Sequence, residues 1–268
     1  MLFMDEPLSN LDAKLRLEMR SELQRLHLET DSTFVYVTHD QIEAMTLAAK
    51  ICLIENGVLQ QYDAPLDVYG KPANLFVADF VGNPAINFIE AKGTQNGDGS
   101  VSLTALDGQK LSFRANETLN LADWFQKADA ADAAHREAEI ARASQKGSVE
   151  KGNKDTLFRY HVAKINEEDD FGDEVALTDE DFVLGVRPEF LNLDENGPLE
   201  GEIYSAMPTG METTVKVRIG EFLLTGVVFG GVLYQIGQKI RLGFRGSDVV
   251  LFSRKNGRLI ARSSLSVQ

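Results

Sequence analysis

The sequence begins MLFMDEPLSNLD (residues 1–12), in which a short apolar run is followed by two adjacent acids and a proline. The run LFM is typical of a buried β-strand, and Asp5 and Glu6 stand where that strand would end. Adjacent strand residues point to opposite sides, so the two carboxylates can serve different partners. Taken alone, Asp-Glu-Pro is also an ordinary end for a strand at a surface turn. The stretch predicts a strand that carries two acids to the edge of a sheet.

Helix and strand patterns alternate up to about residue 80. The segment SNLD (residues 9–12) has polar side chains suited to a helix start, and apolar residues then recur near helical spacing: Leu11, Leu15, Met19, Leu23 and Leu26. Residues 33–38 (TFVYVT) favour a second buried strand, because β-branched and aromatic side chains dominate them. A short helix is expected over 41–50. This order predicts an α/β fold, with a mainly parallel sheet covered by helices.

A hairpin is expected next, because residues 51–54 (ICLI) and 58–61 flank Asn56-Gly57, a strong turn signal. The only cysteine, Cys52, lies within ICLI, and we expect it to be buried in that strand. One cysteine excludes an intramolecular disulfide and fits a reducing cytoplasm. Two short helical pieces should follow, over residues 65–69 and 73–80.

From about Gly82 the pattern changes to short alternating strands separated by glycine turns. They are expected over 85–92, 100–105, 110–114, 182–186, 199–205, 213–219, 221–228, 239–244, 249–253 and 258–261. Many short strands at such spacing predict an all-β domain, either an antiparallel sandwich or a small barrel. An insert at about 121–180 should begin with an alanine-rich helix, continue through a small polar loop at 147–155 and end in a solvated acidic tract.

Composition excludes some partners. The 268 residues carry a formal net charge of −14, which argues against nucleic acid or an anionic lipid surface as the main partner. No apolar stretch approaches the ~20 residues that span a bilayer, and the first residues do not resemble a signal peptide. We therefore expect a cytoplasmic protein of about two domains.

His39 is the second candidate for chemistry. It follows the strand predicted at 33–38 and precedes a helix, where a side chain emerges at the carboxyl edge of a sheet. There it could contact a γ-phosphate and hold an attacking water in line. A single histidine at a strand end is more often structural, so the residue alone does not decide between the two interpretations.

Three motifs together resemble the ATP-binding subunits of ABC transporters, over roughly residues 1–92. LFMDEP is similar to the Walker B strand, SNLD to the D-loop, and VYVTHD to the switch-histidine loop. AMTLA, GVLQQYDAPLDVYGKPANLFVADFVG and NPAINF resemble the carbohydrate-importing branch, the maltose and multiple-sugar type. That branch carries a regulatory domain of OB-like strands, and residues 185–189 (GVRPE) are similar to a short motif within it.

The resemblance implies a role for each matching residue. Asp5 would bind Mg²⁺, Glu6 would be the catalytic base, and His39 would contact the γ-phosphate of ATP. The D-loop residues Ser9, Asn10 and Asp12 would lie at the contact between two nucleotide domains, near the nucleotide. The implied cofactors of the parent protein are ATP and Mg²⁺.

The chain departs from the family in one way that decides its biochemistry. The phosphate-binding loop G-x-x-x-x-G-K-[ST], the LSGGQ-type signature and the glutamine loop do not occur in it. Without the N–H groups and lysine of that loop, nothing offsets the repulsion between the acids Asp5 and Glu6 and the phosphates. We expect no ATPase activity from these 268 residues alone, and whether the chain is an enzyme stays open.

The sequence thus predicts the C-terminal part of a sugar-importer ATPase subunit. Residues 1–82 would be part of an incomplete P-loop nucleotide domain, and residues 83–268 an OB-like regulatory domain with the insert. Expected partners are a second ATPase subunit (a homodimer through the regulatory domain), transmembrane permease subunits and regulatory proteins, at the inner face of the cell membrane. Two alternatives remain: a regulatory or protein-binding module without catalysis, and a chain whose missing half is supplied by another polypeptide.

Overall fold

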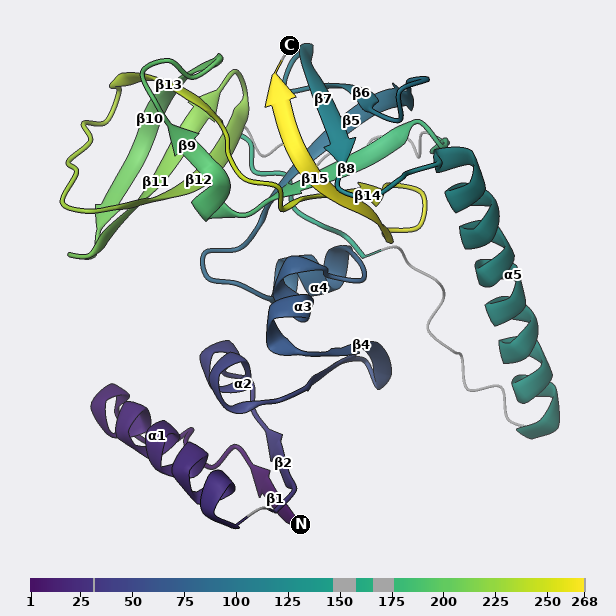
Figure 1. The fold of residues 1–268 in the computed structure, drawn as a ribbon, viewed down its shortest axis with the longest axis vertical. Helices are drawn as coiled ribbons and strands as arrows, with labels where there is room; N and C mark the ends of the chain where they lie inside the picture. The colour runs from purple at the N-terminus through teal and green to yellow at the C-terminus, as the bar shows by residue number, and fades with distance from the viewer. Residues whose placement is uncertain (31, 147–157, 166–175, 268) are drawn as a thin grey trace.

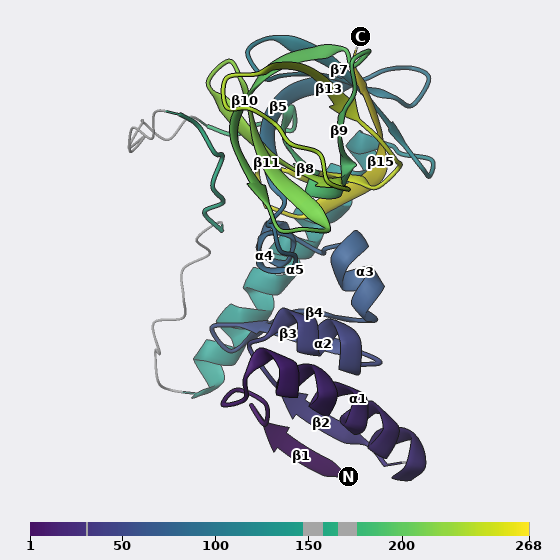
Figure 2. The same ribbon diagram turned by 90° about the vertical axis from the view of Figure 1, so that its left-hand side faces the viewer.

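The computed structural model describes residues 1–30, 32–146, 158–165 and 176–267. A six-stranded closed barrel and a five-stranded sheet lie at one end of the molecule and the first elements of the chain at the other (Figures 1 and 2). Two short helices, α3 (Pro65–Gly70) and α4 (Leu75–Phe80), lie between them. This arrangement makes the two helices the connection between the candidate site and the β-rich region.

The closed barrel has the strand order β14-β15-β7-β6-β5-β8, and each neighbouring pair is antiparallel. Its strands alternate inward and outward side chains, as in β6, where Val101 and Leu103 are buried. The bounds are β5 Asn87–Gln95, β6 Val101–Ala105, β7 Gln109–Ala115, β8 Asp181–Val186, β14 Val249–Ser253 and β15 Leu259–Val267. Barrel closure leaves these strands without a free edge.

The second sheet has the order β12-β11-β10-β13-β9 and is also antiparallel. Its apolar side chains, including Val215 and Leu224, join Phe113 and Leu184 of the barrel in one hydrophobic cluster. The bounds are β9 Leu191–Leu193, β10 Leu199–Pro208, β11 Glu212–Ile219, β12 Phe222–Phe229 and β13 Lys239–Phe244. The prediction of an all-β region is therefore confirmed, although the three-residue strand β9 was not expected.

The first elements have the expected order of strand, helix, strand and helix. They are β1 (Leu2–Asp5), α1 (Ala13–Thr30), β2 (Phe34–Val37) and α2 (Gln41–Leu47). β1 and β2 pair in parallel, as predicted. They form a sheet of two strands, so the parallel sheet covered by helices is not seen among the described residues.

Because the sheet has two strands, the prediction that they are buried is wrong. Phe3 is 70% exposed and Val37 54% exposed, and α1 contains no buried residue. A parallel sheet is normally covered on both faces, and here the apolar side chains of both strands reach the surface.

The predicted hairpin is formed by β3 (Ile51–Glu55) and β4 (Val58–Asp63), with positive φ at both Asn56 and Gly57. Leu53 packs with Val68 of α3 and Val77 of α4. Cys52 is exposed rather than buried, since consecutive strand residues face opposite sides and only the side of Leu53 is covered.

The alanine-rich helix is α5 (Leu121–Lys146), which extends away from the barrel (Figure 1). Its first turns are attached to the barrel because Leu121 and Phe125 are buried in the large hydrophobic cluster. Residues 147–155, predicted as a loop, and most of the acidic tract (166–175) lie outside the described residues. At the end of that tract Asp181 is buried and accepts hydrogen bonds from Thr178.

Arg187 joins the helices to the barrel. It directly follows β8, is 3% exposed, and its guanidinium donates to the backbone oxygens of Tyr69 (3.0 Å), Ala78 (3.1 Å) and Val81. These carbonyls lie at the C-terminal ends of α3 and α4, where the helix dipoles are negative. The guanidinium carbon also lies 4.1 Å from the centre of the Tyr69 ring. One cation therefore holds the ends of two helices against the barrel.

We predict that Arg187→Met lowers the free energy of unfolding by about 3 to 5 kcal/mol, because it leaves buried carbonyls without donors. Arg187→Lys should recover only part of this, since an ammonium lacks the planar fork. The measurement is urea unfolding of each variant. The control is Arg114→Met, which removes an exposed ion pair with Asp98 and should change stability by less than about 1 kcal/mol. An effect of Arg187→Met as small as that of the control would contradict the prediction.

Candidate functional site

The candidate site lies where β1 and β2 end, at the carboxyl edge of the parallel pair. The Glu6 N–H donates to the carbonyl of Val37 (2.8 Å), which extends the pairing by one residue. Glu6 itself has φ +42°, a left-handed conformation that is uncommon for a residue with a side chain. Such conformations are enriched at functional sites, where surrounding contacts maintain them. Here the turn lets the Glu6 side chain reach the end of β2.

Two of the residues predicted from the sequence meet at this edge. The Nδ1 atom of His39 lies 2.9 Å from Oε1 of Glu6, although the residues are 33 positions apart in the chain. The His39 side chain is 73% exposed and that of Glu6 46% exposed. The hydrogen bond to Glu6 and the charge of Glu6 raise the pKa of His39 above its usual value, with Asp40 and Glu43 contributing. The pair therefore favours a protonated imidazole beside a carboxylate.

The other predicted residues lie around this pair. The hydroxyl of Ser9 donates to the backbone oxygen of Glu6 (2.9 Å) and holds the turn after β1. Asp12 accepts from the N–H groups of Lys14 and Leu15 (both 3.0 Å), so it caps α1. Asp5 ends β1 with an exposed side chain, and Asn10 is exposed in the turn that follows.

A network behind His39 was not predicted from the sequence. Glu43 is 2% exposed and accepts hydrogen bonds from the hydroxyls of Tyr36 (2.9 Å) and Thr38 (2.8 Å). Burial and the bond to Glu43 raise the pKa of Tyr36. Arg16 of α1 lies 3.3 Å from Asp40 and 4.0 Å from Glu43, which connects α1 to the end of β2.

Asp40 fixes the direction of the chain after His39. Its carboxylate accepts from the N–H groups of Ile42 (2.8 Å) and Glu43 (3.2 Å) and so caps α2. The spacing Asp40-x-x-Glu43 is the capping-box signature, which is the sequence signal that could have drawn attention to Glu43. In the structure the Glu43 carboxylate instead accepts from Tyr36 in β2 and from Thr38 directly after it, and this stabilises the position of His39.

A small cavity of about 30 Å³ lies between these groups, bordered by Glu6, Ser9, Arg16, Thr38, His39, Asp40 and Glu43. A water molecule occupies ~30 Å³ in the liquid, so the cavity has room for about one. A water there would be adjacent to a carboxylate able to accept its proton. The geometry is thus suited to holding a water beside an acid–base pair.

The residues fit Mg²⁺ better than they fit a triphosphate. Asp5 offers the hard oxygen ligand that Mg²⁺ prefers, and such sites are usually completed by phosphates and water. Among the described residues no group of three or more histidine, cysteine or acidic side chains could hold a metal ion by itself. The sequence contains no phosphate-binding loop, so we derive no hydrolytic step for this chain alone. In the described part of the chain, no helix is both long and apolar enough to cross a bilayer.

Known proteins resemble the chain over different lengths. Protein y4oS of Sinorhizobium fredii, an uncharacterized ABC transporter ATP-binding protein, is 33% identical over 257 residues, or 96% of this chain and 53% of y4oS. YcjV of Escherichia coli O157:H7, with the same description, is 56% identical over 101 residues, 38% of this chain and 28% of YcjV. The sn-glycerol-3-phosphate import ATP-binding protein UgpC of Burkholderia pseudomallei is 52% identical over 107 residues, 40% of this chain and 29% of UgpC.

No protein-family model matches the chain. Among solved structures, the cytoplasmic molybdate-binding protein ModG aligns with a TM-score of 0.32 and 16% identity, over 62% of this chain and 94% of ModG. That similarity is too low to carry an argument.

The sequence relatives show the class of protein to which the chain is similar. The chain is homologous to ABC transporter ATP-binding proteins, and the resemblance predicted from its motifs is confirmed. The relatives include import proteins such as UgpC and the osmoprotective-compound uptake protein GgtA of Synechocystis. The chain spans about half the length of y4oS and less of the others.

We predict that Glu6→Gln lowers the pKa of His39 toward that of a free histidine, because it removes the carboxylate that stabilises the imidazolium. The measurement is an NMR pH titration of the imidazole signals, which is tractable because the chain has four histidines. Glu195→Gln, an exposed acid in the turn before β10, is the matched control and should leave the pKa of His39 unchanged. An equal pKa in wild type and Glu6→Gln would show that the 2.9 Å contact does not form in solution.

Proposed function

We propose that this chain is the part of an ABC importer ATPase subunit that supplies the water-activating residues and a regulatory domain. The observation that carries the proposal is the contact between Glu6 and His39 at the ends of two parallel strands. General-base chemistry needs a carboxylate beside the attacking water, and phosphoryl transfer needs a positioned group at the γ-phosphate. The homology to ABC transporter ATP-binding proteins supports the same assignment.

Each residue then has a role when ATP and Mg²⁺ are bound in the complete protein. Asp5 would be a ligand of Mg²⁺, which would supply positive charge to neutralise the phosphates. Glu6 accepts a proton from the attacking water, and protonated His39 donates to an oxygen of the γ-phosphate. Ser9, Asn10 and Asp12 form the turn that faces the second subunit. The phosphate-binding loop comes from a segment that these 268 residues do not include.

Residues 1–82 form the nucleotide-domain portion of a P-loop fold and residues 83–268 an OB-like regulatory domain with an insert at about 121–180. The change from mixed to all-β structure near residue 82 supports this division. The subunit works at the inner face of the cell membrane and couples ATP hydrolysis to import of a sugar by permease subunits. Similarity to UgpC and GgtA, which act in import and uptake, supports a role in import.

A module without catalysis is the second candidate, and one surface favours it. Met211, Phe229 and Leu233 are 83%, 63% and 81% exposed at one end of the five-stranded sheet. They lie close together because the N–H of Gly230 donates to the carbonyl of Met211 and the Thr213 hydroxyl to that of Val232. Exposed apolar patches of this kind mark protein interfaces.

The ATPase test uses phosphate release. The chain alone should show no turnover, whereas co-expression with a segment that carries a phosphate-binding loop and an ABC signature should restore it. The restored activity should fall by about 10²-fold or more in Glu6→Gln, since a general base contributes 10²–10⁴-fold. Glu195→Gln should retain it.

Turnover by the chain alone that Glu6→Gln abolishes would contradict the predicted inactivity. A restored activity insensitive to Glu6→Gln would contradict the catalytic assignment. The module is favoured if Mg²⁺–ATP shows no heat of binding even to the chain co-expressed with that segment, because the chain alone is expected not to bind ATP in either case. An affinity for Mg²⁺–ATP that Asp5→Ala removes favours the enzyme.

The homodimer is tested by sedimentation. We predict a concentration-dependent dimer that Leu233→Glu weakens at least about tenfold, because a charge would be desolvated in an apolar contact. Leu17→Glu, on the exposed surface of α1, is the control and should leave the dimer intact. A monomer at all concentrations would contradict the predicted dimer.

A further inference from the structure

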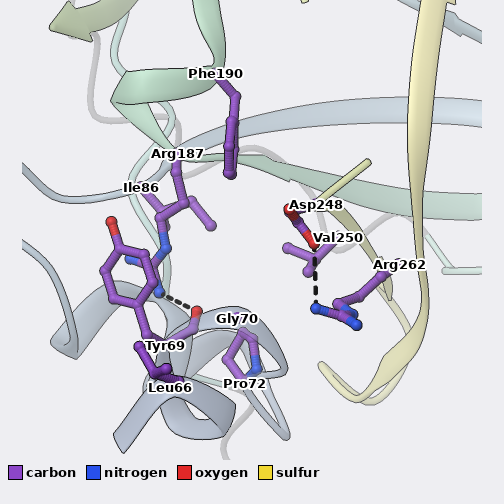
Figure 3. Close-up of a pocket in the computed structure, with 10 residues that line it drawn as sticks. All are labelled: Leu66, Tyr69, Gly70, Pro72, Ile86, Arg187, Phe190, Asp248, Val250 and Arg262. Carbon is purple, nitrogen blue, oxygen red and sulfur yellow. Dashed lines mark hydrogen bonds and ion pairs between the residues drawn. The ribbon is translucent and has the colours of Figure 1, made fainter. Parts of the chain in front are cut away.

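A second cavity lies between α3 and the barrel, far along the chain from the candidate site. It encloses about 200 Å³, and Figure 3 shows the residues around it. One side is formed by α3 and the residues after it, the other by the barrel strands β14 and β15 and the turn after β8. The lining residues are Leu66, Tyr69, Gly70, Pro72, Ile86, Arg187, Phe190, Asp248, Val250 and Arg262.

The charge of this lining is opposite to that of the protein. Two arginines and one aspartate border the cavity, whereas the chain as a whole carries a net charge of −14. The hydrogen bonds of Arg187 all go to backbone carbonyls, so among the described residues no carboxylate is bonded to it. The lining itself holds one more cation than anion, which attracts small anions, although the nearby carboxylates of Glu189 and Asp79 also act on the charge of Arg187.

Most N–H donors of the Arg262 guanidinium make no hydrogen bond within the described chain. Within the described chain its guanidinium makes one hydrogen bond, from Nη1 to the carboxylate of Asp248 at 3.2 Å, and its side chain is 30% exposed. A guanidinium has five N–H donors in a planar fork that matches a carboxylate or phosphate. Gly70 leaves room beside it, since a Cβ at this position would lie 3.5 Å from Nη1. A ligand oxyanion could thus reach Arg262 without displacing the backbone.

The rest of the lining suits a small organic molecule. Tyr69, Phe190 and Val250 provide apolar surface, and the second oxygen of Asp248 can accept from a ligand hydroxyl. A cavity of ~150 Å³ holds benzene, so 200 Å³ suits a ligand of about six to ten non-hydrogen atoms. Nucleotides and disaccharides are too large for it.

We propose that this cavity binds a small organic oxyanion, a carboxylate or phosphate of about three to six carbon atoms, through Arg262. Such a ligand would contact both α3 and the barrel, so its binding would stabilise the junction that Arg187 also holds. The site is separate from the cavity beside Glu6 and His39, and the proposal does not depend on ATP hydrolysis.

The experiment is an NMR titration of the whole chain that follows the backbone amide of Gly70. Lactate and glycerol 3-phosphate distinguish a carboxylate from a phosphate ligand, and glycerol is the neutral control. We expect a saturable shift with lactate or glycerol 3-phosphate and none with glycerol; the tighter ligand identifies the source. If neither anion produces a saturable shift, the proposal is overturned.

Three variants are expected to change the affinity for the anion differently: one weakens it, one tightens it and one leaves it unchanged. Arg262→Met should weaken binding at least about tenfold, because it removes the charged donor. Asp248→Asn should tighten it, since it removes the carboxylate that competes for Arg262. Arg114→Met, an exposed arginine of the same barrel, should leave the affinity unchanged. If Arg262 served only in folding, Asp248→Asn would not be expected to increase the affinity for the anion.

If Arg262→Met does not fold, Gly70→Leu takes its place. Gly70 ends α3 without a positive φ, so a side chain is compatible with its backbone and would occupy the cavity beside Arg262. Binding should again weaken at least about tenfold. Equal affinity in wild type and in Gly70→Leu or Arg262→Met would show that the anion binds elsewhere and would overturn the proposal.

Discussion

The burial of one guanidinium is the constraint on which the arrangement of the molecule depends. Arg187 satisfies carbonyls at the ends of α3 and α4, and these are groups that a helix leaves without internal partners. A buried cation is unfavourable unless hydrogen bonds compensate for lost hydration, so the two helix ends and Arg187 stabilise one another. Gly82 makes this possible, because a Cβ there would lie 2.7 Å from Nη1. Moving either helix would leave both the cation and the carbonyls unsatisfied.

The same junction is connected to the candidate site by a short series of contacts. Gln41, the first residue of α2, accepts from the N–H of Gly82 (2.8 Å) and donates to the carbonyl of Phe80. His39 lies two positions before Gln41. The residues that lead into the barrel follow directly after Gly82. The direction of α2 is therefore fixed at its start by the capping carboxylate of Asp40 and by the segment that Arg187 holds. This contact series positions the elements; coupling between sites would additionally require two arrangements with different ligand affinities.

Local patterns predicted most elements, and tertiary contacts decided what the patterns missed. Strands after residue 82 are short alternating or apolar runs between turn residues, so their positions could be predicted, whereas β9 is too short to show a pattern. The apolar run around Cys52 predicts a buried cysteine, but within the described chain only the side of Leu53 is covered. The type of residue identified Glu6 and His39, and their distance depends on parallel pairing across 33 positions. Glu43 was missed because its hydrogen bonds come from Tyr36 in β2 and Thr38 directly after it, contacts that the sequence pattern does not show.

In the proposed function, the water-activating residues and the phosphate-binding groups belong to separate segments. Glu6 and His39 are held together by interactions within residues 1–43: the parallel pairing, the turn stabilised by Ser9 and the cap at Asp40. None of these interactions requires a nucleotide. Binding a triphosphate, however, needs cationic and N–H donors directed at the phosphates, and the carboxylates at this edge have the opposite charge. The Glu6–His39 pair is therefore assembled without a nucleotide, and under the proposed function its use would depend on another segment that supplies the positive charge.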